Sequence, residues 1–557
     1  MVSSLLYVIL GRAYAGRLIV SRSEKPQDDR LGGRPSFGSE RLRQHPYFIL
    51  PDGSNRKAAF DLGQRFLHLT IDALATAGDR PPLAPETGEP PLSPGYEPPR
   101  EGRDPEELLA HIRERILPRA LNVSHPGYVG HMDTLASAIG AFSDMLVSAL
   151  NNNMLCWEMS PVFTEMEARL LGWFSGAIGW PHPAKTVPPS GSHPAPRPSR
   201  STGFLVSGGS LANLSAILAA RNAQCGPDFR ERGLAAAPGP PVILASEEVH
   251  YSLDKIANIL GIGSRGLVRV PTDAAMRMDP AALEQTLARL RRDGQWPFCV
   301  VGIAGTTVAG AIDPLEAIGR IARREGLWFH VDAAYGGSLM ITTGTEHEHV
   351  RRRLAGIELA DSVTFNPQKW LFVPKTCAGV FFRDSHRVAG AVRQTFPYAG
   401  SRSAAIDDDR RNVGEYTIQG TRRVDILKLW LTLEHLGRDL LAELMVASLE
   451  RARTLTERII ADPECELLTN PELNIVCFRY VPAGWDRASR AREVDDLNKR
   501  IHARLESEAH GWIALPRHRG RRWLRFVILH PQADDERLAG LHRRVVAIGR
   551  ELVSPAR

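Results

Sequence analysis

Short apolar runs alternate with amphipathic segments through the middle of the chain. Apolar runs bounded by turn residues predict buried strands, and apolar positions three and four residues apart predict helices. The two patterns follow each other in turn, with strands predicted at 203–207, 241–245, 267–270, 298–304 and 327–332 and helices at 211–222, 252–260, 280–292 and 314–325. This alternation predicts an α/β fold in which a mostly parallel central sheet is covered by helices on both faces.

The rest of the chain divides into segments with other patterns. Residues 1–56 are rich in Gly, Pro, Arg and Ser and show little periodicity, so we expect a mobile leader. Residues 57–120 contain two helical patterns around a proline-dense linker, which predicts an N-terminal helical segment. We expect a large ligand-binding domain at 121–436. A second alternation of strands and helices predicts a small C-terminal α+β domain at 437–557.

Charge and hydropathy exclude two classes of partner. Lys and Arg number 69 against 63 for Asp and Glu, which leaves a formal net charge of +6 over 557 residues. Much of the excess lies in the arginine-rich stretches 351–353 and 517–525, which we interpret as solvated faces. Because no basic stripe is interleaved with exposed aromatic residues, nucleic acid is not an expected partner. The apolar run at 4–10 is too short to cross a bilayer, so no membrane partner is expected.

Cysteine usage bears on the compartment. The six cysteines are scattered and form neither a CxxC pair nor a zinc-binding spacing, so no metal site is expected. Residues 13–15 resemble a signal-peptidase site, but no positive charge precedes the short apolar run before them. Scattered thiols in a large chain are typical of reduced cysteines, and we expect a cytoplasmic protein.

The stretch Ser362–Leu371, SVTFNPQKWL, carries the strongest candidate chemistry. Val363 and Phe365 predict a buried strand that ends at the turn Asn366–Pro367, and Lys369 follows directly. Apolar neighbours withdraw the amine from water, which lowers its pKa and makes it nucleophilic, as a Schiff-base lysine requires. In this window alone, a surface lysine lying over apolar neighbours would give the same pattern.

Two more predicted strand ends suit an anionic ring compound. The turn Ser207–Ser210 precedes a helix, and its glycines and free N–H groups suit a phosphate, although a plain helix-entry turn has the same sequence. Asp332 ends an apolar strand, so its carboxylate needs a cationic partner such as a protonated ring nitrogen. It could equally cap the segment that follows. Ala333 and Ala334 leave room for a flat ring.

Hydroxyl and imidazole groups follow two other predicted strands. Thr306 and Thr307 could hydrogen-bond a ring substituent, and His250 could stack on a ring or move protons near neutral pH. Each signal is weak alone, because such residues are common after strands. An amine for an aldehyde, an anion cradle and an acid for a ring nitrogen are nevertheless the parts that pyridoxal 5'-phosphate requires of a protein.

With these residues the chain resembles the group II pyridoxal-phosphate-dependent amino-acid decarboxylases, which include aromatic-L-amino-acid, tyrosine, histidine and glutamate decarboxylases. The resemblance covers roughly residues 58–550, and its most specific motifs are HVDAAYGG at 330–337 and NPQKW at 366–370. It implies fold type I, the aspartate-aminotransferase-like fold, with pyridoxal 5'-phosphate bound in the domain at 121–436. It also implies a homodimer with the active site at the subunit interface.

The resemblance assigns roles to individual residues. Lys369 is similar to the lysine that binds the cofactor aldehyde, Asp332 to the partner of the ring nitrogen, and His250 to the histidine stacked on the ring. Tyr398 lies where the family has a mobile catalytic loop, whose tyrosine returns a proton. Gln368 departs from the histidine that many members have at this position, which leaves the subfamily open. The other implied cofactor contacts are Thr134, Gly209, Ser210, Thr307, Ala334 and Asn366.

The expected reaction is α-decarboxylation of an L-amino acid to its amine and carbon dioxide. An aromatic substrate is the first expectation, because the helical segment 135–142 is apolar. An acidic substrate, glutamate or aspartate, is the alternative, with Arg402 or Arg422 at the mouth of the site. A decarboxylating aldehyde synthase, an aminotransferase and a carbon–sulfur lyase are other reactions of this fold. A catalytically inactive interaction module is the non-enzyme alternative, against which the intact candidate residues argue.

Overall fold

The structure is a computed structural model of the chain that describes residues 47–83, 92, 95–180, 201–397, 405–406, 408–508 and 511–554. The chain divides into two compact units, Met1–Asp72 with Pro99–Ala110 and Ala73–Pro98 with His111–Arg557. The described part of the first unit is largely helical and contains most of α3 (Arg56–Ala75) and α4 (Pro105–His111). Both sheets of three or more strands lie in the second unit.

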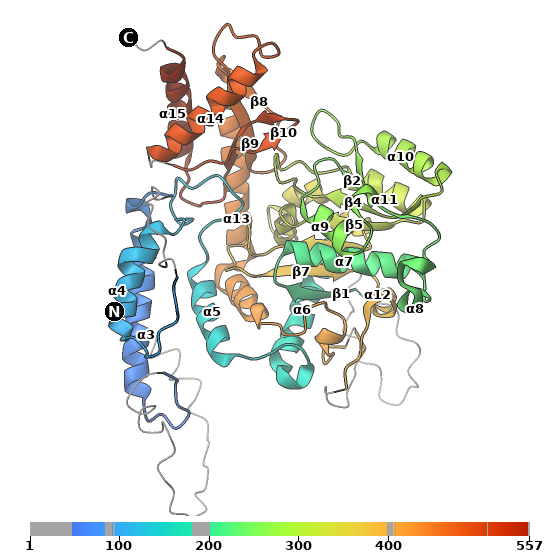
Figure 1. The fold of residues 1–557 in the computed structure, drawn as a ribbon, viewed down its shortest axis with the longest axis horizontal. Coiled ribbons are helices and arrows are strands. Elements are labelled where there is room, and N and C mark those ends of the chain that lie inside the picture. The colour runs from blue at the N-terminus through green and yellow to red at the C-terminus, as the bar shows by residue number, and fades with distance from the viewer. Residues whose placement is uncertain are drawn as a thin grey trace, which may run out of the picture. The chain divides into compact units, whose positions relative to one another are not determined.

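A seven-stranded sheet forms the centre of the second unit (Figure 1). Its order is β1-β7-β6-β5-β4-β2-β3, and its neighbouring strands run parallel except β7, which is antiparallel to both β1 and β6. The mostly parallel sheet expected from the sequence is therefore confirmed, with β7 as an unpredicted insertion. The strands are β1 (Thr202–Val206), β2 (Pro241–Ser246), β3 (Leu267–Val270), β4 (Trp296–Ile303), β5 (Trp328–Asp332), β6 (Ser362–Phe365) and β7 (Ala378–Phe382).

Side chains of the strands alternate between two apolar layers. In β2, Ile243 and Ala245 belong to one layer, whereas Val242 and Leu244 belong to the other. Burial on both faces explains why these strands appear in the sequence as continuous apolar runs. The first layer includes α7 (Gly209–Cys225), α9 (Ser252–Ile259) and α12 (Ser385–Val392), and the second includes α6 (Pro161–Ile178), α10 (Pro280–Arg292) and α11 (Leu315–Arg324).

A smaller α+β part follows the large sheet, as the sequence predicts. It begins within the long helix α13 (Asp425–Ala461), whose helical conformation is interrupted at Gly437 with φ 71°. A positive φ of this kind is adopted readily by glycine alone. We propose that this interruption marks the boundary expected between 436 and 437. The other elements are β8 (Cys465–Leu467), β9 (Ile475–Tyr480), α14 (Ala491–Ser507), β10 (Arg517–His518), β11 (Arg521–Arg522), β12 (Leu524–Val527) and α15 (Asp535–Val553).

The expectation that Arg422 could lie at the mouth of the site needs correction. Arg422 does not lie at a mouth: it is 4% exposed, and its guanidinium pairs with both carboxylate oxygens of Glu167, the nearer at 2.7 Å. A buried pair of this kind ties α6 to the segment before α13 and is not available to a substrate. Arg402 lies outside the described residues. In the described part of the chain, no helix is both long and apolar enough to span a membrane.

Candidate active site

The carboxyl ends of the strands β1, β2, β4, β5 and β6 meet at one cavity of about 200 Å³. Ligands in open α/β sheets bind at this edge, so the position agrees with the fold. Among the residues that line the cavity are eight of those singled out in the sequence: Gly209, Ser210, His250, Thr307, Asp332, Ala334, Asn366 and Lys369. Residues far apart in the chain are thus brought to a single site.

Two predicted residues are not among those that line this cavity. Thr134 lies two residues after Met132, which does line it, and the Thr134 hydroxyl is buried without a hydrogen-bond partner. Its role as a cofactor contact stays a prediction. Tyr398 lies outside the described residues, so its role also stays a prediction.

Lys369 follows the turn after β6. Its backbone N–H donates to the Asn366 carbonyl at 3.1 Å, while Trp370 and Leu371 are fully buried and anchor the segment in the core. The Lys369 Nζ atom lies 3.8 Å from the Met132 sulfur. Burial lowers the pKa of the amine, and the negative charge of Asp332 partly opposes this effect. A lowered pKa favours the neutral, nucleophilic form of an amine, and the role of Lys369 stays a prediction.

Asp332 is 7% exposed and ends β5, with its carboxylate in the same cavity. One oxygen accepts a hydrogen bond from the Asn213 side-chain amide at 2.7 Å, and the other accepts from the Ala334 backbone N–H at 3.1 Å. Asn213 lies on α7, one turn after the glycine-rich turn. Asn213 was not predicted from the sequence, although a polar residue on the buried face of an apolar helix is a usable signal.

A chain of buried hydrogen bonds extends from Asp332 to the start of the same strand. Burial lowers the pKa of His330 to about 4, so its ring is neutral at pH 7 and carries one N–H. Because Asn213 donates to Asp332, its oxygen accepts from His330 Nε2 at 3.1 Å. His330 Nδ1 then accepts from the Ser362 hydroxyl at 2.9 Å, and that oxygen accepts from Trp328 Nε1 at 2.8 Å. We call this chain the Trp328–Asp332 relay.

His250 follows β2 and lines the cavity. Its Nδ1 atom lies 2.8 Å from the Ser252 hydroxyl and accepts from the Ser252 backbone N–H at 3.3 Å. An acceptor at Nδ1 leaves the proton of the neutral ring on Nε2. Burial lowers the pKa of His250, and Lys369 lowers it further while Asp332 raises it. The ring is thus neutral near pH 7 and suited to stacking.

The turn at the start of α7 fits a phosphate group. A Cβ atom at Gly209 would lie 2.7 Å from the Asn366 side-chain nitrogen, so only glycine fits here without a shift. The Asn366 side-chain oxygen is buried without a hydrogen-bond partner in the described structure. Free N–H groups at a helix N-terminus, beside a position that only glycine fits, are what a cradle for a phosphate monoester provides. The residues present therefore fit pyridoxal 5'-phosphate.

Arg525 is a further residue at this site, and the interpretation of 517–525 as a solvated face is wrong for it. It lies on β12 and is 4% exposed. Its guanidinium donates to the carbonyls of Thr307 at 2.6 Å and Gly130 at 3.0 Å, and it lies 3.0 Å from His131 Nδ1. The small domain thus contributes a buried cation beside the cofactor cavity. The sequence does not distinguish Arg525 from the other arginines close to it.

One group of potential metal ligands lies elsewhere in the described part of the chain. Asp462, Cys465 and His542 place one ligand atom each within 4.8 Å of one another. The Cys465 sulfur lies 3.5 Å from His542 Nε2, which is also hydrogen-bonding distance for a thiol. The expectation that the chain has no metal site stays a prediction.

Comparison with known proteins shows the family of the chain. The model of the pyridoxal-dependent decarboxylase conserved domain matches residues 94–481. An L-2,4-diaminobutyrate decarboxylase of Rhizobium meliloti is 31% identical over 441 residues, which are 79% of this chain and 81% of that protein. An acidic amino acid decarboxylase of Xenopus tropicalis is 29% identical (81% and 85%), and an aromatic-L-amino-acid decarboxylase of Bacillus atrophaeus is 25% identical (82% and 87%).

The fold has a solved counterpart. The crystal structure of mouse CSAD is similar to this chain with a TM-score of 0.77 and 28% sequence identity. The match covers 88% of this chain and 98% of the mouse chain. Fold and site together define a fold type I enzyme that binds pyridoxal 5'-phosphate. The chain belongs to the pyridoxal-dependent decarboxylase family, and it is a carboxy-lyase that acts on an amino acid.

The Asn213 hydrogen bond to Asp332 generates a prediction. Replacing Asn213 with Ala leaves a buried carboxylate oxygen without its donor and breaks the relay. A hydrogen bond to a charged group contributes about 1.5–3 kcal/mol, so we expect apoenzyme to bind the cofactor at least about tenfold more weakly. Fluorescence titration with pyridoxal 5'-phosphate measures this. Ser215→Ala on the same helix is the control, and an equal loss in both variants would contradict the assignment.

Proposed function

We propose that Lys369 is the residue to which the cofactor aldehyde is bound and that Asp332 is the partner of the ring nitrogen. The observation that carries this is a single small cavity lined by an amine of lowered pKa and by a buried carboxylate. When bound, pyridoxal 5'-phosphate supplies an electron sink for the electrons of the bond that breaks between the substrate Cα and its carboxylate. Asp332 supports that chemistry by stabilising positive charge on the ring.

The remaining residues would hold the cofactor and exclude water. Gly209, Ser210 and Asn366 would bind the phosphate, Ala334 would lie against the ring, and Thr307 would contact its edge. His250, neutral and held at Nδ1 by Ser252, would stack on the ring with Nε2–H free to donate. Either His250 or Tyr398 would return a proton to the substrate Cα.

The substrate carboxylate needs a cation, and we propose Arg525 for this role. It lies against the carbonyl of Thr307, a residue that lines the cavity. It is already oriented by two carbonyl groups, so its side chain loses little freedom when it binds an anion. His131, 3.0 Å from its guanidinium, would form the neighbouring wall.

We further propose that the substrate is a short L-amino acid with a cationic side chain, such as L-2,4-diaminobutyrate. Asp133 forms an ion pair with Lys375, and both act on the pKa of Lys369, which supports a position close to the reacting amine. Glu248 adds a second carboxylate to the cavity wall. With Arg525 assigned to the α-carboxylate, a substrate cation would compete with Lys375 for Asp133 and with His518, 3.2 Å away, for Glu248.

The relatives bear on the same choice. The diaminobutyrate decarboxylase of Rhizobium meliloti is 31% identical to this chain and the cysteine sulfinic acid decarboxylase of Mus musculus is 32% identical, whereas the aromatic decarboxylase of Bacillus atrophaeus is 25% identical. An acidic substrate is the second candidate, because the ammonium group of Lys375 would pair with its side-chain carboxylate. The aromatic expectation rested on an apolar segment, but Phe142 is 40% exposed on α5 (Ala138–Leu150) and does not line the cavity.

Neutralising the charge of Asp133 or of Lys375 tests which class of substrate the enzyme prefers. Amine formation is measured for diaminobutyrate, glutamate, aspartate, cysteine sulfinate and the aromatic amino acids. For diaminobutyrate we expect the highest kcat/KM, at least a tenfold loss in Asp133→Asn, and no loss in Lys375→Met, because the freed carboxylate still binds a cation. If glutamate, aspartate or cysteine sulfinate gives the highest kcat/KM and only Lys375→Met lowers it, the substrate is acidic. Fastest turnover of an aromatic amino acid, unaffected by both changes, would contradict the proposal.

We also propose that the protein acts as a homodimer. The helix α5 exposes Phe142 (40%), Met145 (64%) and Leu146 (48%), which lie within one turn of each other and form an apolar surface. Such a patch on a soluble enzyme is a typical subunit interface. Light scattering after gel filtration is expected to give twice the chain mass of 61.4 kDa. Met145→Glu is expected to give monomers, and a monomeric wild type would contradict the proposal.

A further inference from the structure

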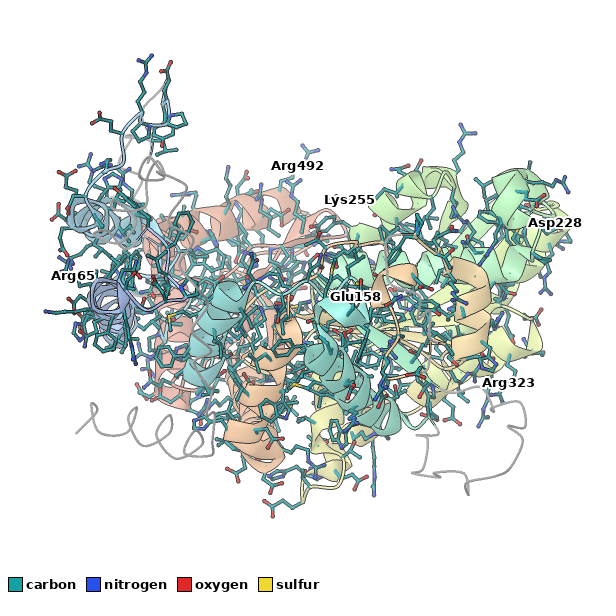
Figure 2. The ribbon with its side chains drawn as sticks, turned by 90° about the horizontal axis from the view of Figure 1, so that it is seen from below. Arg65, Glu158, Asp228, Lys255, Arg323 and Arg492 are labelled. Atoms are coloured by element: carbon teal, nitrogen blue, oxygen red, sulfur yellow. The ribbon has the colours of Figure 1, made fainter. Side chains whose placement is uncertain are left out.

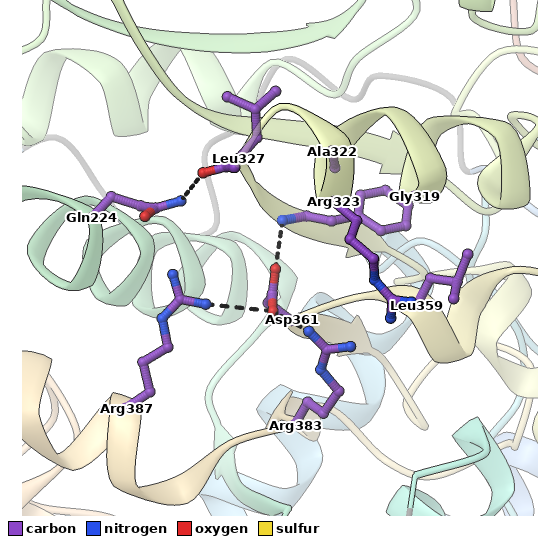
Figure 3. A pocket seen from close by; sticks show the side chains of 11 residues that line it. Gln224, Gly319, Ala322, Arg323, Leu327, Leu359, Asp361, Arg383 and Arg387 are labelled. Carbon is purple, nitrogen blue, oxygen red and sulfur yellow. Dashed lines mark hydrogen bonds and ion pairs between the residues drawn. The ribbon is translucent and has the colours of Figure 1, made fainter.

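A second cavity of about 200 Å³ lies at the opposite, amino edge of β5 and β6 (Figure 3). Three guanidinium groups line it, from Arg323 on α11, Arg383 after β7 and Arg387 on α12. Asp361, directly before β6, is the one carboxylate among the lining residues. We call this site the arginine pocket. Three positive groups against one negative group leave it with a formal charge of +2.

The carboxylate of Asp361 is committed to its surroundings. One oxygen accepts from the Phe329 backbone N–H at 2.9 Å, and the other accepts from Arg383 at 2.5 Å and lies 3.6 Å from Arg387 (Figure 3). Arg387 also lies over the Trp328 ring, 4.6 Å from its centroid. These contacts hold two guanidinium groups in place, although about a third of each side chain is exposed to solvent.

Arg323 differs from its neighbours on α11. Arg324 pairs with Glu284 and Glu325, and Arg320 pairs with Glu316. Within the described residues, the Arg323 guanidinium has no carboxylate partner, and its side chain is exposed at the surface of the second unit (Figure 2). A cation left unpaired beside two prepositioned guanidinium groups suits an additional anion rather than an internal ion pair.

The walls of the pocket indicate the size of the ligand. Leu327 and Leu359 add apolar side chains to the wall, and Gly319 contributes no side chain. The Gln224 amide is directed to the carbonyl of Gly326 at 2.9 Å and so does not oppose an anion. A volume of about 200 Å³ admits a phosphate or a short dicarboxylate but not a nucleotide.

The arginine pocket has a physical connection to the cofactor acid. Trp328, which Arg387 covers, is the first member of the Trp328–Asp332 relay, and its indole N–H donates to Ser362. Phe329 and Asp361 lie one residue inside β5 and one residue before β6. A ligand that shifts Arg387 or Asp361 therefore acts on the two strands whose other ends carry Asp332 and lead to Lys369.

We propose that the arginine pocket is a binding site for a small oxyanion, a phosphate or a short dicarboxylate, and that its occupancy is coupled through the relay to the environment of the bound cofactor. The proposal is independent of which amino acid is decarboxylated. It assigns a ligand site about one strand length from the reaction, at the edge of the sheet that the cofactor does not use.

Binding is tested on the holoenzyme, whose phosphate cradle is already filled. Isothermal titration with inorganic phosphate, and separately with succinate, is carried out at constant ionic strength. We expect saturable binding of at least one of them at one site per chain, weakened at least tenfold by Arg323→Gln and by Arg387→Gln. Arg320→Gln on the same helix is the control and should bind like wild type. No saturable binding, or an equal loss in the Arg320 variant, would overturn the site.

Coupling is tested by the visible absorbance and circular dichroism of the bound cofactor. Addition of the anion is expected to shift these signals in the wild type and in Arg320→Gln. In Ser362→Ala, which removes one hydroxyl from the relay, the anion should still bind while the shift is lost. An anion that binds the wild type and leaves the cofactor signals unchanged would overturn the coupling. None of these readouts depends on turnover, so they remain valid if the substrate assignment fails.

Discussion

The carboxylate of Asp332, held out of water at the end of β5, is the constraint on which the rest of the site depends. Burying an isolated carboxylate costs several kcal/mol unless hydrogen bonds and an opposite charge compensate. Asn213 and the Ala334 backbone N–H supply the hydrogen bonds, and the Trp328–Asp332 relay orients Asn213 so that it donates. The remaining demand is for a cation, which the amine of Lys369 and a protonated ring can both meet. A site built this way favours a cofactor with a basic ring nitrogen.

Much of this arrangement is predictable from the sequence because it is local. Asp332 and Lys369 lie at the ends of apolar strands, and parallel strands place their carboxyl ends at one edge. Asn213 and Arg525 are not predictable in this way, because their partners are 119 and 395 residues away along the chain. The antiparallel strand β7 was also missed, since no helix separates it from β6 and the alternating pattern breaks there. Arginine-rich composition was misleading, because Arg525 lies in β12, where all four residues are buried.

The two ends of β5 and β6 have different chemistry. Their carboxyl ends lead to an amine, an acid and a glycine-rich turn, and the small domain adds Arg525 to this edge. Their amino ends meet three arginines around Asp361. Strands of five and four residues and one buried relay connect the two edges. A rigid connection of this length is suited to carry energetic coupling between the two edges.

One buried amine, that of Lys369, is proposed to bind the cofactor. Apoenzyme is incubated with pyridoxal 5'-phosphate over a range of pH, reduced with borohydride and digested, and the labelled peptide is identified by mass spectrometry. The label is expected on Lys369. The rate of labelling should stay high at pH values well below 10.5, the ordinary pKa of lysine, because burial lowers the pKa of this amine. A label on another lysine, or a rate that follows a pKa near 10.5, would contradict the account.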